Sequence, residues 1–134
     1  MVEEVIVRSK ELFYRGQNLD ELKKLDVREV AKYLPSRSRR SVLRHFEIIE
    51  KFIKRCESSI SQKKRIKTHL RDIVVVPRMV GMSINVHNGK TFKEVKVTHQ
   101  MIGHRLGEFS LTRAKVSHGT PAIGSTKSSS GDKK

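Results

Sequence analysis

An Asn-Gly pair between two runs of alternating residues constrains this 134-residue chain more than any other feature. Asn88-Gly89 is the pair that a type I′ turn favours, because both central residues of such a turn need positive φ. A repeat of two residues on both sides is typical of strands with one buried face. The sequence therefore predicts a β-hairpin with a type I′ turn. Its alternating apolar residues are Met82, Ile84 and Val86 before the turn, and Phe92, Val95 and Val97 after it.

The second run breaks this alternation once, because Phe92 and Val95 are three residues apart. A β-bulge near Lys93 or Glu94 would restore the pattern. A third strand, at the edge of the sheet, is expected around residues 66–68. The residues that would then face the other way form one basic strip: Lys67, His69 and Arg71. We expect a small, largely antiparallel three-stranded sheet.

The segments on either side of the hairpin are short and apolar. The periodicity of residues 73–76 by itself indicates a buried strand. After the hairpin, Thr98 is an expected N-cap for a short helix over residues 99–102, which Gly103 would end. Gly107 suggests a close approach of two backbone segments.

Helices are predicted before the sheet. Asn18 with Glu21, and Asp26 with Glu29, have the spacing of capping boxes, and Pro35 would end the second of these helices. A further helix is expected from residue 36, with apolar residues at helical spacing. These are Val42, Leu43, Phe46, Ile49 and Ile53.

The remaining segments of this half are less regular. Residues 58–64 are predicted to form a polar linker. At the N-terminus, Glu4 to Leu12 fits a frayed helix that residues 13–16 would end. The predicted fold class is α+β: N-terminal helices packed beside the sheet, followed by an extended basic C-terminal tail.

Charge restricts the partners. The net charge is +15, with +4 in residues 1–57 (14 Lys and Arg against 10 Asp and Glu) and +11 in residues 58–134 (15 against 4). Such a chain repels itself unless a polyanion compensates, so nucleic acid is the first candidate partner. An anionic membrane is a poor second, because no apolar run approaches a spanning length. The first residues do not resemble a signal peptide.

The sequence lacks the residue patterns of a phosphate-binding loop, a disulfide and a metal site. Gly89-Lys90-Thr91 resembles the end of a phosphate-binding loop, but Ile84 stands where that loop needs glycine. Cys56 is the single cysteine, so no internal disulfide forms, which fits a reducing, cytosolic setting. No histidine pair has the spacing of a closed metal site. Neither a cofactor nor a metal is expected.

Catalysis is also not expected. No nucleophile, base and orienting group can be identified in the sequence. Glu108 is better interpreted as a structural carboxylate that caps backbone N–H groups or pairs with an arginine. The basic cluster at Arg37, Arg39 and Arg40 alternates with serine and has no acid nearby. That pattern favours RNA phosphate over a merely solvated helix face.

The further RNA-binding candidates are basic residues beside small residues that let a backbone approach. Aromatic residues are few, so base stacking is expected to be a minor mode, and phosphate and shape recognition of largely double-stranded RNA fits better. These candidates are Lys67, Arg71, Lys90, His104, Arg105, Arg113, Lys115 and His118.

Several of these motifs together resemble the small-subunit ribosomal protein nineteen family, in its archaeal and eukaryotic branch. The signature falls between Asn88 and Thr112, with Ile102-Gly103 and Leu106-Gly107-Glu108-Phe109 at the family's spacing. The resemblance covers roughly residues 12–129. Further matching stretches are Leu34-Pro35-Ser36-Arg37, Lys67-Thr68-His69-Leu70-Arg71-Asp72, Pro77-Arg78-Met79-Val80-Gly81 and Val116-Ser117-His118-Gly119.

The resemblance implies a structural protein of the small ribosomal subunit, located in the cytoplasm. It would bind small-subunit rRNA in the subunit head (the 3′ domain) and pair with small-subunit protein thirteen. Its tail would reach toward the decoding site and the tRNAs. The resemblance also implies that residues 73–76 are an extended segment turning at Pro77, and adds Thr68, Asn88, Gly89 and Thr112 to the rRNA-binding residues.

We therefore expect four sections. These are an N-terminal extension (1–17), a helical region (18–64), a core of sheet and short helix that binds rRNA (65–112) and the basic tail (113–134). Two other function classes remain open: an RNA- or DNA-binding regulator outside the ribosome, and an enzyme acting on RNA. Sedimentation with the small subunit would separate the first, and turnover of labelled RNA would expose the second.

Overall fold

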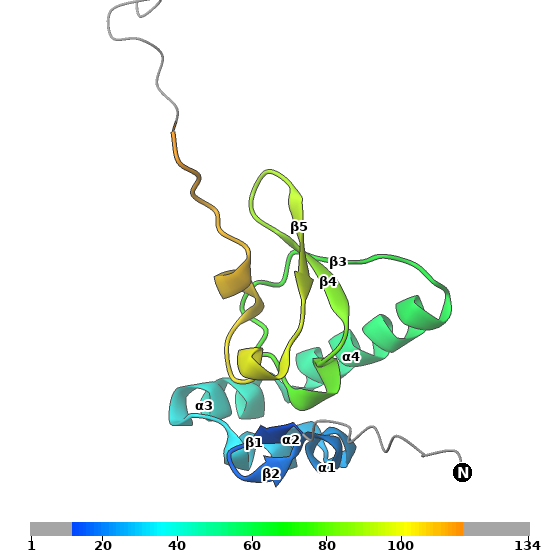
Figure 1. The fold of residues 1–134 in the computed structure, drawn as a ribbon, viewed down its shortest axis with the longest axis vertical. Coiled ribbons are helices and arrows are strands. Elements are labelled where there is room, and N and C mark those ends of the chain that lie inside the picture. The colour runs from blue at the N-terminus through cyan, green and yellow to red at the C-terminus, as the bar shows by residue number, and fades with distance from the viewer. Residues whose placement is uncertain (1–11, 117–134) are drawn as a thin grey trace, which may run out of the picture.

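The structure is a computed structural model that describes residues 12–116. The helix expected from Glu4 and the tail beyond Val116 lie outside the described residues. Helices occupy one end of the molecule and a three-stranded sheet rises from them, while residues 110–116 lead away from the sheet (Figure 1). The predicted α+β class is confirmed.

A tight hairpin opens the described chain. Strands β1 (Phe13–Tyr14) and β2 (Gln17–Asn18) are antiparallel and joined by Arg15 and Gly16. Their φ angles are 49° and 80°, so both central residues have the positive φ of a type I′ turn. Residues 13–16 were predicted to end a helix, but they form a hairpin instead.

Two short helices follow as predicted. Helix α1 (Leu19–Lys24) is capped by Asn18, whose Oδ1 accepts a hydrogen bond from the amide of Asp20 at 3.1 Å. Helix α2 (Val27–Val30) continues into the 3₁₀ helix η1 (Ala31–Tyr33). The Glu29 carboxylate accepts from the Asp26 amide at 3.4 Å, which is the return bond of a capping box.

Where the sequence predicted one helix from residue 36, the structure has two. Helix α3 (Ser36–Arg44) and helix α4 (Phe46–Ser61) are separated by His45, whose φ and ψ of −118° and 25° leave the helical region. Helix α4 also includes residues 58–61 of the predicted linker. The hydroxyls of Ser59 and Ser61 donate to carbonyls one turn earlier, so these polar side chains are satisfied within the helix.

The sheet is mixed, which corrects the prediction of a largely antiparallel one. Its order is β3 (Ile66–Thr68), β4 (Ser83–His87), β5 (Phe92–Lys96), with β3 parallel to β4 and β4 antiparallel to β5. The long connection from β3 to β4 contains residues 73–76 and the 3₁₀ helix η2 (Pro77–Met79), and it returns the chain to the end where β3 began. A crossover of that length permits parallel pairing.

The predicted hairpin is confirmed, but its predicted turn and bulge are wrong. The loop has four residues, 88–91, and the β4–β5 register is continuous from Ser83↔Lys96 to His87↔Phe92. Gly89 has φ of 98°, whereas Asn88 is not among the residues with positive φ. Instead, Asn88 Oδ1 accepts from the amides of Lys90 (3.0 Å) and Thr91 (2.7 Å), an Asx-type turn.

Residues 73–76 are extended and wholly buried, and the chain turns at Pro77 as the resemblance implied. Their partner is residues 103–106, which connect η3 (His99–Met101) to the start of η4 (Leu106–Phe109). The Val75 amide donates to His104 O at 2.8 Å. The helix expected after Thr98 is thus a 3₁₀ helix, and the Thr98 side chain makes no cap bond.

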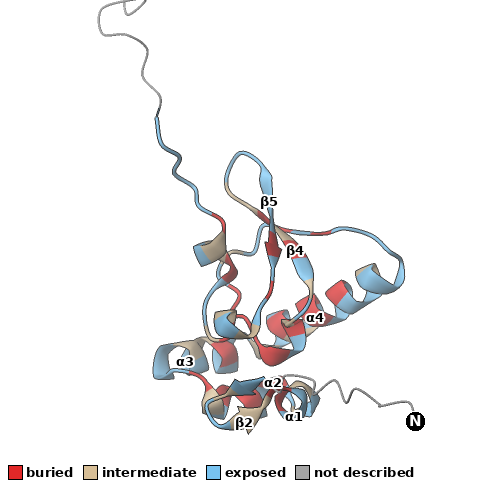
Figure 2. Cartoon of the chain, viewed as in Figure 1, coloured by how far each residue is buried: buried red, intermediate tan, exposed pale blue. Residues whose placement is uncertain are grey.

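One hydrophobic core joins the helices to the sheet. Buried Phe52 and Ile53 of α4 belong to the same cluster as Ile84 and Val86 of β4. The core therefore includes residues from both the 18–64 and the 65–112 sections. Figure 2 shows the burial concentrated where α4 meets the sheet, while the β4–β5 loop and residues 111–116 are exposed.

Candidate nucleic-acid interface

The β4–β5 loop and the neighbouring end of the sheet form the first basic surface, which we name the sheet tip. The register places Ile84 and Val86 on the buried face, so Asn85 and His87 lie on the outer face. Parallel pairing puts Lys67 beside Asn85 on that same face. The sheet tip consists of Lys67, His69, His87, Asn88, Gly89, Lys90 and Phe92.

Three rings of the sheet tip touch. The centroids of His69 and His87 are 4.4 Å apart, and Phe92 lies 5.2 Å from His69 and 4.8 Å from His87. Phe92 therefore belongs to the outer face, opposite the buried Val95, which explains why the strand needs no bulge. The Lys67 ammonium lies 5.4 Å from the centre of the Phe92 ring.

Arg71 faces inward, beneath the sheet tip. Its guanidinium donates to the carbonyls of His87, Gly107 (2.8 Å) and Ser110 (2.6 Å). A Cβ added at Gly107 would lie 3.0 Å from both Arg71 Cβ and Arg71 O, so the predicted close approach is confirmed. Arg71 thus joins β4 to the chain that leads into residues 110–116.

Thr68 has an internal role as well. It is buried, and its hydroxyl accepts from the amide of Leu70 at 3.0 Å. Asn88 and Gly89 shape the loop, while Lys67 and Lys90 are exposed.

Helix α3 forms the second basic surface, the α3 face. The α3 face borders a surface hollow of about 460 Å³. A second hollow, of about 480 Å³, lies between the end of α4 and β3. The α3 hollow is lined by Ser36, Arg37, Arg39, Arg40, Leu43 and Arg44. None of its lining residues is acidic, so the hollow favours anions.

Arg39 differs from its neighbours. Its guanidinium donates to the carbonyls of Ala31 (3.1 Å), Lys32 (2.8 Å) and Leu34 (3.4 Å), at the end of η1. Arg37 and Arg40 are exposed and line the hollow together with Arg39. Arg39 therefore holds the helical connection together, while its two neighbours face solvent.

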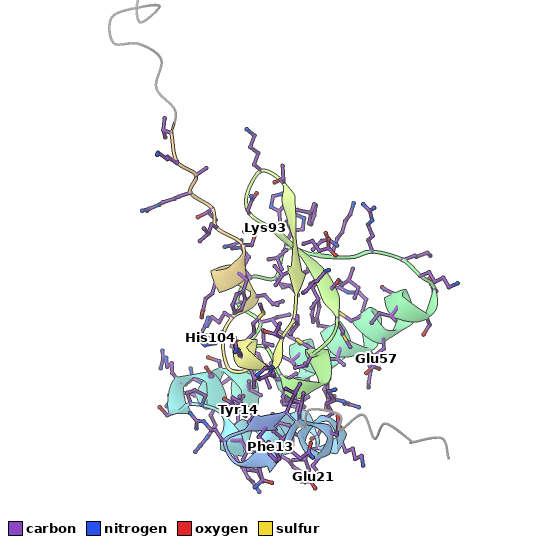
Figure 3. The ribbon with its side chains drawn as sticks, viewed as in Figure 1. Phe13, Tyr14, Glu21, Glu57, Lys93 and His104 are labelled. Carbon is purple, nitrogen blue, oxygen red and sulfur yellow. The ribbon has the colours of Figure 1, made fainter. Side chains whose placement is uncertain are left out.

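A short junction attaches α3 to the segment after η3. The Ser38 hydroxyl donates to Gly103 O at 2.7 Å, and Arg105 donates to the Ser41 hydroxyl at 3.2 Å. Glu108 accepts from the Arg105 amide at 3.2 Å and lies 2.8 Å from His104 Nδ1. The prediction that Glu108 caps a backbone N–H as a structural carboxylate is confirmed. Figure 3 labels its partner His104.

The structure thus brings the predicted residues together in groups. Lys67, Asn88, Gly89 and Lys90 share the sheet tip, and Arg105 extends the α3 face. Residues 112–116, including Thr112, Arg113 and Lys115, are exposed and have no helix or strand. His118 lies outside the described residues. The two surfaces also contain four residues outside the predicted binding set: His69, His87 and Phe92 at the sheet tip, and Arg44 at the α3 hollow. For His87 the signal was present, because the period of two places it on the polar face of its strand.

Neither a metal site nor a membrane-spanning helix is found in the described part of the chain. Residues 12–116 contain no group of three or more His, Cys, Asp or Glu side chains able to hold a metal. None of the helices in this range is both long and apolar enough to cross a bilayer.

Comparison with known proteins gives a family. The model of the family described as "Ribosomal protein S19" matches residues 18–118. The small ribosomal subunit protein uS19 of Methanocella arvoryzae is 47% identical over 122 residues, covering 91% of this chain and 86% of that protein. The protein of the same name from Halorubrum lacusprofundi is 46% identical over 125 residues, covering 90% and 88%. The chain belongs to the ribosomal protein S19 family, a family of structural proteins of the small ribosomal subunit.

Proposed function

We propose that this protein binds small-subunit rRNA in the subunit head, its 3′ domain, and stabilises the RNA fold there. One observation carries the proposal: among the described residues, 12–116, the lysines and arginines of both surfaces have no carboxylate partner. Within residues 12–116 the ion pairs are Lys23–Asp20 and His104–Glu108, and neither involves an arginine of the α3 face or a lysine of the sheet tip. Uncompensated cations on a folded scaffold are the electrostatic footprint of a nucleic-acid-binding protein.

The proposed rRNA-binding residues act in two ways. Exposed cations contact phosphate, whereas Arg39, Thr68 and Arg71 hold the backbone that presents them. The full proposed set is Arg37, Arg39, Arg40, Lys67, Thr68, Arg71, Asn88, Gly89, Lys90, His104, Arg105, Thr112, Arg113, Lys115 and His118.

The binding mechanism is mainly electrostatic. Each phosphate that a lysine or arginine neutralises releases condensed counterions, so log K falls by roughly 0.7–0.9 for each contact as log[salt] rises. Arginine adds a bidentate grip on phosphate oxygens, which lysine cannot make. The α3 face therefore supplies directed contacts and the sheet tip supplies lysine charge.

Two further partners follow from the family resemblance. The protein would pair with small-subunit protein thirteen, and its tail (113–134) would extend toward the decoding site and the tRNAs. The cytoplasm is the proposed location, with residues 18–64 and 65–112 forming the body that anchors the tail. The exposed, irregular path of residues 112–116 supports a tail that leaves this body.

The test is sedimentation of the full-length protein with ribosomal subunits at physiological salt, followed by crosslinking to RNA. We expect co-sedimentation with the small subunit and crosslinks from both basic surfaces to the 3′ domain. A protein that stays at the top of the gradient would be a regulator acting outside the ribosome. Turnover of labelled RNA by the purified protein would instead indicate an enzyme.

A further inference from the structure

The aromatic rings of this chain are scarce, yet three rings gather at one exposed place. The chain has no Trp, two Tyr and five Phe. At the sheet tip, Phe92 is 37% exposed, and His69 and His87 contact it at interplanar angles of 77° and 66°. Edge-to-face contacts of this kind hold the Phe92 ring in a set orientation.

A hydrophobic core does not account for this cluster. The buried face of the same strands carries Ile84, Val86 and Val95, and all three are at most 5% exposed. The rings lie on the other side of the sheet, as the register requires. Phe92 and His69 are exposed and His87 is half-buried, so no described element covers the cluster.

The surroundings of the rings favour a ligand that is both flat and anionic. The Lys67 ammonium is 5.4 Å from the centre of the Phe92 ring, and Lys90 is exposed in the adjoining loop. Glu94 is the acidic residue of the outer face on β5 and stands opposite Asn85, in the same cross-strand row as Lys67. It forms no ion pair within residues 12–116, and the loop residues 88–91 contain no acid. Aromatic side chains next to cations are what single-stranded nucleic acids bind, through base stacking and phosphate contact.

We propose that the sheet tip stacks an unpaired RNA base on Phe92, with Lys67 and Lys90 neutralising the adjoining phosphates. The proposal rests on the rRNA-binding function above and adds the kind of RNA bound at this end. In a duplex both faces of each base are covered by neighbouring bases, so the ligand is a nucleotide of a loop, bulge or strand end. Every base has a π-face, so the contact tolerates different sequences.

The test uses full-length protein and two RNA probes. One is a short single strand that contains a single 2-aminopurine, whose fluorescence reports stacking, and the other is a blunt duplex of the same sequence. Phe92→Leu removes the ring and keeps an apolar side chain. It should weaken single-strand binding by roughly 5- to 150-fold, which corresponds to the usual contribution of one stacked base. Duplex affinity and the salt slope should not change, because no charge is removed.

Phe13→Leu is the matched control. Phe13 is also an exposed phenylalanine, at 56%, and it lies at the end of the molecule opposite Lys93 in Figure 3. This variant should bind both probes like the unmodified protein. A second variant, His69→Ala, removes a ring outside the strands, so it tests the cluster without altering the sheet.

The outcomes separate the two proposals. Single-strand affinity that is unchanged in Phe92→Leu, or lost equally in Phe13→Leu, would overturn stacking and leave rRNA binding in place. Equal weakening of both probes by Phe92→Leu with an unchanged melting temperature would also overturn it. Absence of RNA binding by the unmodified protein would overturn the proposed function itself.

Discussion

The sheet tip and the α3 face are both basic, but they are built differently. The sheet tip combines rings with two lysines on a three-stranded scaffold. The α3 face offers arginines along a single helix, with the exposed Leu43 between them. The first surface suits an unpaired base with its phosphates, and the second suits a run of phosphates alone.

The two surfaces share one structural feature, an arginine bound to backbone carbonyls. Each has an arginine that binds three backbone carbonyls: the half-buried Arg71 beneath the sheet tip, and Arg39, which is exposed and lines the α3 hollow. These carbonyls lie at the end of β4 and in or next to the 3₁₀ helices η1 and η4, and a guanidinium has five donors with which to satisfy them. A count of basic residues therefore overstates the charge that is free to bind RNA.

The largest effect is expected from Arg71→Met. It leaves three carbonyls without their donor, so the free energy of unfolding should fall by about 3 kcal/mol. Urea melts would measure it, with Lys67→Met, which removes an exposed cation four residues earlier, as the matched control. The control should keep the wild-type midpoint and reduce the salt slope of RNA binding by roughly 0.7–0.9. Equal midpoints for the two variants would contradict the inward role of Arg71.

Gly89→Val is expected to act on the sheet tip alone. Gly89 has φ of 98°, and nothing lies within 4 Å of an added Cβ, so the cost is backbone strain without a clash. That strain should lower stability by roughly 1–3 kcal/mol in urea melts. Lys90→Ala, one residue along the loop, serves as the control. An unchanged midpoint for Gly89→Val would show that the loop relaxes to another conformation.

Arg39→Gln and Arg40→Gln compare an arginine that binds backbone carbonyls with its exposed neighbour on the same helix. Arg39→Gln should destabilise the protein by about 1–2 kcal/mol, because its carbonyl partners lose a charged donor. Arg40→Gln should leave the melt unchanged and lower the salt slope by roughly 0.7–0.9. If both variants changed the slope and neither changed the melt, Arg39 would be an RNA ligand like its neighbours.

The alkylation rate of the buried Cys56 thiol measures how often the core opens in variants of the two surfaces. Burial raises the pKa of its thiol to about 11, so the thiol is neutral and shielded at pH 8. Alkylation at pH 8 should be slow in the native protein and fast in urea. The Arg71→Met variant should react faster than Arg40→Gln, since it opens more often. Because the folded-state pKa is above its unfolded value, this group's contribution to stability is present below about pH 9 and lost as pH approaches 11.

The smallest effect on stability is expected from truncation after Val116. Residues 112–116 are exposed, so the melting temperature should stay nearly the same. Incorporation into small subunits should also persist, because both surfaces remain. The proposed tail role predicts weaker tRNA binding or altered decoding accuracy in the resulting subunits. A large drop in melting temperature would make the tail part of the core, and normal tRNA handling would remove the proposed tail function.

Local patterns in the sequence were enough for many elements. Asn-Gly between alternating runs predicted the hairpin, and Asn18 predicted a helix start, because turns and caps depend on residues close in sequence. The predicted turn type was wrong because the Asn88 side chain itself accepts hydrogen bonds from the loop amides. The two consecutive positive φ angles of a type I′ turn occur instead at Arg15-Gly16, which is not an Asn-Gly pair. The family match also required only the spacing of residues along the chain.

The alternation of the strands, the helix caps and the excess of cations can be read directly from the residues, since each depends on near neighbours or on composition alone. Which cations are free to bind RNA depends instead on contacts between distant segments. Arg71 binds carbonyls 16 to 39 residues away, and Phe92 meets His69 across the sheet. The parallel pairing of β3 also depends on the crossover through residues 73–76. Contacts between distant segments form only when the core brings those segments together, so no local pattern could have shown them.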